Sequence, residues 1–196
     1  MSARDRSHGV LFPLFLKLEG KRVVVVGGGA VGERKVVELL EAGAEVAVVA
    51  INATEATVAH ARAGRLTLQL RAFEDRDLDG AWLAIAATGD AAVNESVLIA
   101  ADARRIFVNA VDDPARASAY FASIVRRPPF TIAISSAGEL PAMARLLREV
   151  LEAMLPPDRF IAQARALRRK WRRERTPMGE RFAELVARLV TRPPKA

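Results

Sequence analysis

Three glycines follow a run of valines near the start of the chain, in the stretch VVVVGGGAVG. Gly27, Gly29 and Gly32 occupy the three glycine positions of the pattern G-x-G-x-x-G. In such a loop the first glycine permits a tight turn, the second lets the backbone approach a pyrophosphate, and the third lets the following helix pack closely on the sheet. The helix N-terminus then offers N–H groups to phosphate oxygens. The stretch predicts a dinucleotide site, and a tight turn without a ligand is the competing interpretation.

Two further chain segments are expected to flank that site. The second predicted strand ends in Ile51 and Asn52, where an Asp or Glu would bind the adenine ribose. Asn52 could hydrogen-bond a ribose hydroxyl, but without a carboxylate it gives little rejection of a 2′-phosphate, so NAD and NADP both stay open. Thr88 ends another predicted strand beside the crevice of the sheet. A cofactor contact and an ordinary strand-to-helix turn explain Thr88 equally well.

Strands and helices alternate around these loops. Apolar runs of strand length lie at 22–26, 45–49, 66–70, 82–87 and 107–111. Between them, Val36 and Leu39 share one face of a helix that Gly43 ends, and residues 90–105 repeat the helical pattern. Such alternation favours parallel strands joined by right-handed crossovers. We therefore predict an α/β fold, a Rossmann-like doubly wound parallel sheet over residues 20–112.

The pattern changes after Val111. A loop, two strand-like pieces that include 130–135 and a long helix follow, and the segment LPP at 155–157 ends that helix. Two more helices, divided by TPMG, are predicted to reach residue 190. The predicted domains are a dinucleotide-binding (Rossmann) domain at 1–114, a small α+β segment at 115–155 and a basic helical C-terminal domain at 156–196.

Composition limits the chemistry that the chain can carry. Its 196 residues include no Cys and 2 His, so disulfides, thiolate metal sites and a cysteine nucleophile are excluded. Proton transfer then falls mainly to carboxylates, hydroxyls or amines. No apolar stretch approaches the roughly 20 residues that span a bilayer, and the N-terminus has no small-residue cleavage site. We expect a soluble, cytoplasmic protein without a membrane partner.

Positive charge is concentrated towards the C-terminus. Residues 159–196 hold 12 Lys and Arg against 3 Asp and Glu, a net of +9, which leaves −2 for residues 1–158. The segment RALRRKWRRER would place basic side chains almost all round a helix. That surface suits phosphate, an anionic lipid surface or a small molecule with many carboxylates. A solvated helix whose arginine stems cover apolar neighbours explains it at least as well.

Two later motifs make a resemblance to a known family specific. FVNAVDDP, at 107–114, and FTIAISSAGELPAMARLLRE, at 130–149, follow the glycine loop in the order found in the siroheme synthase N-terminal family. LFPLFLKLEGKRVVVVGGGAVGERK, WLAIAAT and MGERF add to the match. That family comprises precorrin-2 dehydrogenases, some of which are also sirohydrochlorin ferrochelatases. The sequence resembles it from about Leu11 to Leu155, and more faintly to about Leu189.

The resemblance implies an enzyme of siroheme biosynthesis that oxidises precorrin-2 to sirohydrochlorin with NAD. Ferrous iron would be a second substrate where the ferrochelatase activity is present. The resemblance also implies a homodimer through residues 115–150, which makes 115–155 a dimerisation segment. The many carboxylates of the tetrapyrrole give Arg126, Arg127, Arg145 and Arg148 a candidate role, although a surface role is favoured for each.

The resemblance further assigns site residues. The essential aspartate of the family, thought to act as general base, falls on Asp112, and the serine at its active-site mouth, phosphorylated in some members, falls on Ser136. Contacts to NAD fall near Ala30, Val31, Ile51 and Asn52. No metal-ligand cluster of fixed spacing is present.

The residues themselves support part of this assignment. Asp112 ends the fifth predicted strand, at the edge of the sheet where ligands of open α/β folds bind. Without the resemblance, a turn-forming aspartate before Pro114 would be the favoured interpretation. Asn109, on the same strand face, could orient the substrate or Asp112, or simply hold backbone. Ala137 stands where family members have glycine and resists a left-handed conformation, so we expect a different loop beside Ser136.

Three other classes of function compete with this one. A non-catalytic dinucleotide-sensing regulatory domain would share the glycine loop but needs no base over the nicotinamide. A nucleic-acid-binding protein is suggested by the arginine-rich segment, but the chain has 1 Tyr and 2 Trp and no aromatic-glycine RNA signature, so we expect no nucleic acid partner. A Rossmann methyltransferase is a weaker alternative.

Overall fold

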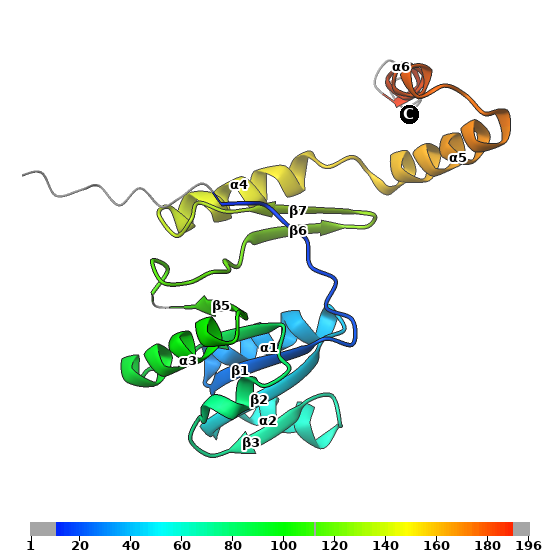
Figure 1. Ribbon diagram of the computed structural model, residues 1–196. Helices are drawn as coiled ribbons and strands as arrows, with labels where there is room; N and C mark the ends of the chain where they lie inside the picture. The colour runs from blue at the N-terminus through cyan, green and yellow to red at the C-terminus, as the bar shows by residue number, and fades with distance from the viewer. Residues whose placement is uncertain (1–10, 112, 190–196) are drawn as a thin grey trace, which may run out of the picture. The chain divides into compact units, whose positions relative to one another are not determined.

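The computed structural model describes residues 11–111 and 113–189 (Figure 1). Its first half contains, in chain order, β1 Arg22–Gly28, α1 Ala30–Glu41, β2 Glu45–Ala53, α2 Glu55–Arg62, β3 Thr67–Leu70, the 3₁₀ helix η1 Asp75–Leu78, β4 Leu83–Ala86, α3 Ala91–Ala103 and β5 Phe107–Ala110. There follow β6 Ser123–Arg127, β7 Phe130–Ile134, α4 Pro141–Met154, α5 Asp158–Glu174 and α6 Met178–Leu189. The chain forms two compact units. One comprises residues up to Ser123 with Ala133–Ala144, and the other comprises Ile124–Ile132 with the residues from Arg145 onward.

The first unit is built on a sheet of five parallel strands in the order β3-β2-β1-β4-β5. At its centre, Val24 of β1 lies between Ala47 of β2 and Ala84 of β4. The strand order reverses between β1 and β4, and open sheets of this kind bind ligands beyond the strand ends at that switch point. This topology confirms the predicted Rossmann-like α/β fold.

Helices cover both faces of the sheet, which explains why β1 is an unbroken run of valines. Val24 and Val26 pack into the core under α3 and η1, whereas Val23 and Val25 pack into the core under α1. All four side chains are at most 2% exposed. A parallel strand with both faces covered needs apolar residues at every position rather than at alternate ones.

The structure adds one helix that was not predicted and fixes the length of the second strand. β2 continues past the apolar run at 45–49 as far as Ala53, so Ile51 and Asn52 lie at its end, as predicted. α2 was not predicted, because Thr57 is its one buried residue and no apolar stripe marks the helix in the sequence. Its start is set instead by Thr54, whose hydroxyl accepts a hydrogen bond from the Thr57 N–H.

The later elements follow the prediction closely. β6 and β7 form a two-stranded hairpin around Pro128 and Pro129, and α4 ends at Met154, directly before LPP. α5 and α6 lie on either side of TPMG. Glu184 of α6 accepts hydrogen bonds from Trp171 Nε1 at 2.6 Å and Lys170 Nζ at 3.0 Å, and these donors lower the pKa of its carboxyl. Within the described residues no helix combines the length and apolarity that a bilayer crossing needs.

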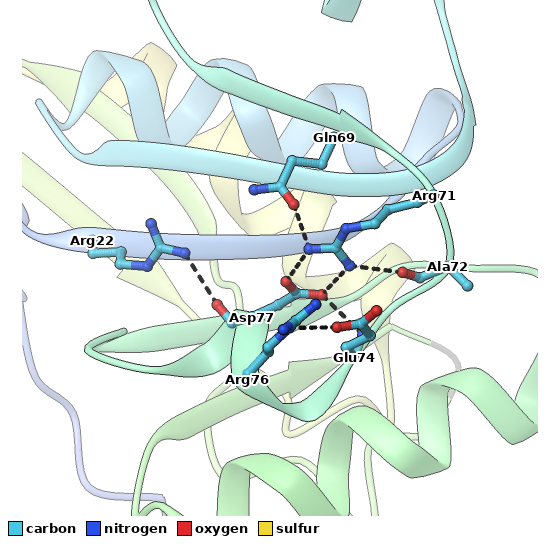
Figure 2. Close-up of polar contacts among 7 residues, drawn as sticks. All are labelled: Arg22, Gln69, Arg71, Ala72, Glu74, Arg76 and Asp77. Carbon is cyan, nitrogen blue, oxygen red and sulfur yellow. Dashed lines mark hydrogen bonds and ion pairs between the residues drawn. The ribbon is translucent and has the colours of Figure 1, made fainter.

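A polar cluster fastens η1 to the end of β3 (Figure 2). The Arg71 guanidinium donates to both carboxylate oxygens of Asp77, to the Gln69 side-chain oxygen and to the Ala72 carbonyl. The Asp77 side chain, 5% exposed, also accepts from the Glu74 N–H at 2.9 Å. The hydrogen bonds from Arg71 lower the pKa of Asp77 below its ordinary 3.8, although burial opposes the shift. The ionised carboxylate therefore stabilises the fold.

We expect Asp77→Asn to lower the free energy of unfolding at pH 7. Because the pKa of Asp77 is lower in the folded chain, its stabilising contribution is complete above the unfolded value of 3.8 and is lost as the pH falls below it. The stability gap between wild type and variant, measured by urea unfolding, should therefore shrink as the pH falls below about 4. Asp79→Asn is the control, because Asp79 is 67% exposed in its pair with Arg104. A gap that is constant with pH would contradict this account.

Candidate active site

The glycine loop, residues 27–32, joins the end of β1 to the start of α1. At three of its glycines, backbone atoms lie so close that no side chain would fit. Gly27 has a φ of +116°, and a Cβ there would lie 2.3 Å from the Ala87 carbonyl oxygen. A Cβ on Gly32 would lie 2.2 Å from the Gly27 oxygen, and one on Gly28 would lie 2.4 Å from the Asn52 oxygen. Sequence analysis missed Gly28, although its place between two motif glycines was the available signal. These three glycines are required by the protein's own packing.

Gly29 differs from its neighbours because a Cβ there would have no atom within 4 Å. Its φ of −76° is also open to any residue. Gly29 is the N-cap of α1 and provides no side-chain cap, whereas Thr54 and Asp90 cap α2 and α3. The next N–H groups, those of Ala30, Val31 and Gly32, have no acceptor within the helix. Open space in front of uncapped amides is what a phosphate group needs.

A cavity of about 440 Å³ opens in front of this loop. It brings together Gly27, Gly29, Ile51, Asn52 and Thr88, all of which the sequence predicted as cofactor contacts. Both Ile51 and Asn52 are exposed at the end of β2. The cavity thus extends from the helix N-terminus to the place where an adenine ribose is expected.

The Thr88 side chain has partners within its own turn. Its hydroxyl lies 2.7 Å from the Asn94 side-chain oxygen and accepts from the Asp90 N–H at 3.1 Å. The Asn94 amide donates in return to the Thr88 carbonyl at 3.0 Å. These bonds shape the cavity wall between β4 and α3.

Sequence analysis also missed Arg71 and Phe73 on the wall of this cavity. Arg71 directly follows β3, at the same edge of the sheet as the other strand ends, and that position was the available signal. It is the one Lys or Arg among the described residues that line the cavity. Its guanidinium is already held by Asp77, as Figure 2 shows.

A second cavity, of about 290 Å³, lies in the same unit. Asn109 and Ser136 both line it, as do Val111 and Pro114, the first and last residues of the VDDP segment. Asp112, the predicted general base, lies outside the described residues. The structure therefore gathers two of the three predicted catalytic residues around one space.

The side chains of these two residues are anchored differently. Asn109 is 8% exposed and its amide donates to the Ala119 carbonyl at 2.9 Å, so it holds the backbone that follows β5. Ser136 Oγ accepts from the Leu140 N–H at 3.1 Å, which leaves its O–H to donate elsewhere. Ser136 is thus the more adaptable of the pair.

The loop beside Ser136 keeps a left-handed turn despite its alanine. Ala137 has a φ of +53°, so it adopts here the left-handed backbone conformation that an alanine was expected to resist. A left-handed alanine costs about 1–2 kcal/mol. Ser135 Oγ accepts from the Ala137 N–H and the Ser136 carbonyl accepts from the Glu139 N–H at 3.0 Å, and both bonds help to offset that cost.

Lys35 is a further cavity residue that sequence analysis missed. It lies on α1 one turn after the predicted contact Val31, and this spacing was the available signal. The predicted carboxylate partners were four arginines and the basic C-terminal segment instead. Its side chain is 18% exposed, and its Nζ lies 3.7 Å from the centroid of the Phe121 ring. Burial lowers the pKa of Lys35, with partial compensation by Glu38. In the part of the chain that the structure describes, no group of three or more His, Asp or Glu could hold a metal ion.

Comparison with known proteins places this geometry in a family. The family described as "Putative NAD(P)-binding" matches residues 14–123, which include the whole parallel sheet. The chain belongs to this family. A nicotinamide dinucleotide is accordingly the class of cofactor for the glycine loop.

Several named proteins are similar over more of the chain than this family match covers. Siroheme synthase of Citrobacter koseri is 47% identical over 171 residues, which are 86% of this chain and 37% of that protein. Siroheme synthase 2 of Cronobacter sakazakii is also 47% identical with the same coverage. The chain thus spans little more than a third of the length of these relatives. The solved structure of SirC, a precorrin-2 dehydrogenase, shares the fold with a TM-score of 0.72 and 23% identity, over 90% of this chain and 88% of that one.

The different environments of the loop glycines in this family member make a testable contrast. We expect Gly27→Ala to lower the free energy of unfolding by about 3 kcal/mol, because the Cβ meets backbone. Gly29→Ala should change it by less than about 1 kcal/mol but weaken dinucleotide binding by about tenfold or more, because its Cβ enters the phosphate space.

Urea unfolding and calorimetric titration with NAD measure the two effects separately. If Gly29→Ala binds NAD as tightly as wild type, the phosphates do not lie against this loop.

Proposed function

We propose that the protein is an NAD-dependent precorrin-2 dehydrogenase that makes sirohydrochlorin for siroheme biosynthesis. The observation that carries this proposal is the presence of two cavities in one unit. One lies in front of the glycine loop at the start of α1, where no side chain caps the helix, and the other is lined by Asn109 and Ser136. Similarity to siroheme synthases supports the tetrapyrrole as substrate. Two separate cavities in one unit support a reaction between a cofactor and a second molecule.

Oxidation of precorrin-2 removes a hydride and a proton from the tetrapyrrole. NAD, when bound, supplies the hydride acceptor. The amides at the start of α1 would hold its diphosphate, and Ile51 and Asn52 would lie beside its ribose. Asp112 follows Val111, a residue of the second cavity, and is our candidate for the base that takes the proton. Ser136 would donate a hydrogen bond to the substrate, and Asn109 would keep the cavity wall in place.

The charges of the first cavity favour NAD over NADP. A 2′-phosphate adds negative charge near the end of β2, where Asn52 offers an amide. Arg71 is the one cation lining the described part of the cavity, and its two terminal nitrogens are engaged by Asp77, Gln69 and Ala72. Asp90 adds a carboxylate to the same wall. A 2′-phosphate that bound these two nitrogens would compete with the Arg71 cluster that fastens η1.

A homodimer is the proposed assembly, with residues 115–155 as its dimerisation segment. α4 exposes an apolar stripe at helical spacing, and its members are 45–74% exposed: Met143, Leu146, Leu147, Val150 and Met154. Contiguous exposed apolar surface of this kind marks an interaction site. A second copy of the chain would cover this stripe. Ferrous iron insertion and a cytoplasmic location, the other expectations from the sequence, stay predictions.

The enzyme assay tests the proposed reaction directly. We expect purified protein to oxidise precorrin-2 with NAD, more slowly with NADP, and the Asp112→Asn variant to lose about 100-fold or more of the rate because it lacks the base. Sirohydrochlorin formation, followed by absorbance, is the measurement. Asp113→Asn is the control beside it. NAD binding without any oxidation would favour the dinucleotide-sensing domain instead, and a wild-type rate for Asp112→Asn would remove that residue from its role.

The proposed dimer predicts a different result for two faces of α4. Leu147→Asp places a carboxylate in the apolar stripe and should convert the dimer to monomer in sedimentation equilibrium. Arg145→Asp places the same group on the opposite face, where Arg145 is 77% exposed, and should leave the dimer intact. A wild type that sediments as a monomer would refute the dimer.

A further inference from the structure

The second cavity contains a half-buried ammonium group that the proposed reaction has not used. Lys35 enters it from α1 with a side chain that is 18% exposed. No other Lys, Arg or His is among the described residues that line this space. In the part of the chain that the structure describes, a half-buried cation thus lines the same cavity as Asn109 and Ser136, two of the three predicted catalytic residues.

The contacts of Lys35 with the rest of the protein are weak. Within the described residues its Nζ has one carboxylate nearby, that of Glu38, at 3.9 Å, and Glu38 itself is 35% exposed. Its other recorded contact is the face of the Phe121 ring, at 3.7 Å from the centroid. An ammonium group can donate three hydrogen bonds, and neither neighbour takes one at ordinary length. Within the described residues, much of its capacity to bind an anion is therefore unused.

Burial makes this arrangement unfavourable for the folded chain by itself. Removing an ammonium group from water costs free energy unless a partner compensates, and the pKa of Lys35 is lowered for that reason. Arg34, the neighbouring cation on α1, lowers it further, while Glu38 opposes the shift. Tyr120 is a further titratable residue that lines this cavity. A methionine of similar length would fit the same contacts without the desolvation cost.

We propose that the Lys35 ammonium is the anion-binding group of the second cavity and holds one carboxylate of a polycarboxylate ligand beside Asn109 and Ser136. The identity of that ligand as a tetrapyrrole rests on the proposed function, but its chemistry as a carboxylate does not. A ligand carboxylate would supply the short, charge-assisted hydrogen bond that the protein does not provide. Lys35 thereby orients the substrate relative to the cofactor.

Four arginines were named as candidate carboxylate partners from the sequence, and Arg126 lines neither cavity. The other three are also less suited to this role. Arg127 lies 3.2 Å from Asp158, Arg145 lies 3.1 Å from Glu149, and Arg148 lies 2.9 Å from Glu152. Each is already paired with an acidic side chain. Lys35 has no such close pair within the described residues.

Two substitutions at Lys35 and one matched control test the proposal. Lys35→Met removes the charge and keeps the length, and Lys35→Arg keeps the charge. Lys21→Met is the control, because Lys21 is also a lysine over an aromatic ring, 4.4 Å from the Trp82 centroid, but lines neither cavity. The probe is uroporphyrin, a stable tetrapyrrole that carries eight carboxylates, with binding measured by fluorescence quenching.

We expect Lys35→Met to weaken uroporphyrin binding by about tenfold or more, Lys35→Arg to weaken it less, and Lys21→Met to bind like wild type. The melting temperature of Lys35→Met should equal or exceed that of wild type, and NAD binding should be unchanged. With precorrin-2 as substrate, the KM of Lys35→Met should rise more than its kcat falls, because the carboxylate contact is made in the ground state and the transition state alike.

The proposal is overturned if wild type does not bind uroporphyrin, if Lys35→Met binds it like wild type, if Lys21→Met loses as much affinity, or if Lys35→Met melts well below wild type. Failure of the proposed function has a separate signature, since wild type would then bind uroporphyrin through Lys35 without oxidising precorrin-2. A wild type that oxidises precorrin-2 while Lys35→Met shows unchanged KM and affinity would leave the function in place and remove Lys35.

Discussion

The close backbone contact at the end of β1 is the constraint on which the site depends. The loop turns so tightly that the Gly27 oxygen approaches Gly32 and the Ala87 carbonyl approaches Gly27, with no room for a Cβ at either glycine. These contacts bring α1 down onto the sheet and point its N-terminus at the edge where the strand order reverses. The helix amides, the end of β2 and the β4–α3 turn then surround one cavity. Of the loop glycines Gly27, Gly28, Gly29 and Gly32, only Gly29 has open space at its Cβ position, which separates the demands of folding from those of a ligand.

The two cavities of the first unit differ in how their charges are used. In the first, the cation Arg71 is neutralised by Asp77 and serves to fasten η1, so the proposed phosphate contacts are assigned to backbone amides. In the second, the cation Lys35 has weak partners within the described residues and lines the space together with Ser136. α1 contributes to both, with its N-terminus at one cavity and its second turn at the other. One helix can therefore hold a cofactor and a substrate in a defined relation.

Much of this arrangement could be predicted from the sequence because local patterns specify it. The valine run, the glycine spacing and the strand–helix alternation predicted the sheet, its loop and the cofactor side of the site. α2 was not predicted, since a threonine cap defines its start and no apolar periodicity marks the helix. Ala137 shows the same limit, because the hydrogen bonds around Ser135 and Ser136 outweigh the residue's own conformational preference.

What the sequence by itself determined was the fold class and the position of the phosphate loop, because both follow from residues close together along the chain. The tertiary structure alone decided which polar groups share a space. Lys35 and Ser136 lie about a hundred residues apart, and only packing of the segment 133–144 onto the first unit places them around one cavity. It also decided which partners each cation has: folding brings Asp77 to Arg71 as a close acidic partner, whereas the acidic partner of Lys35 among the described residues is Glu38, at 3.9 Å.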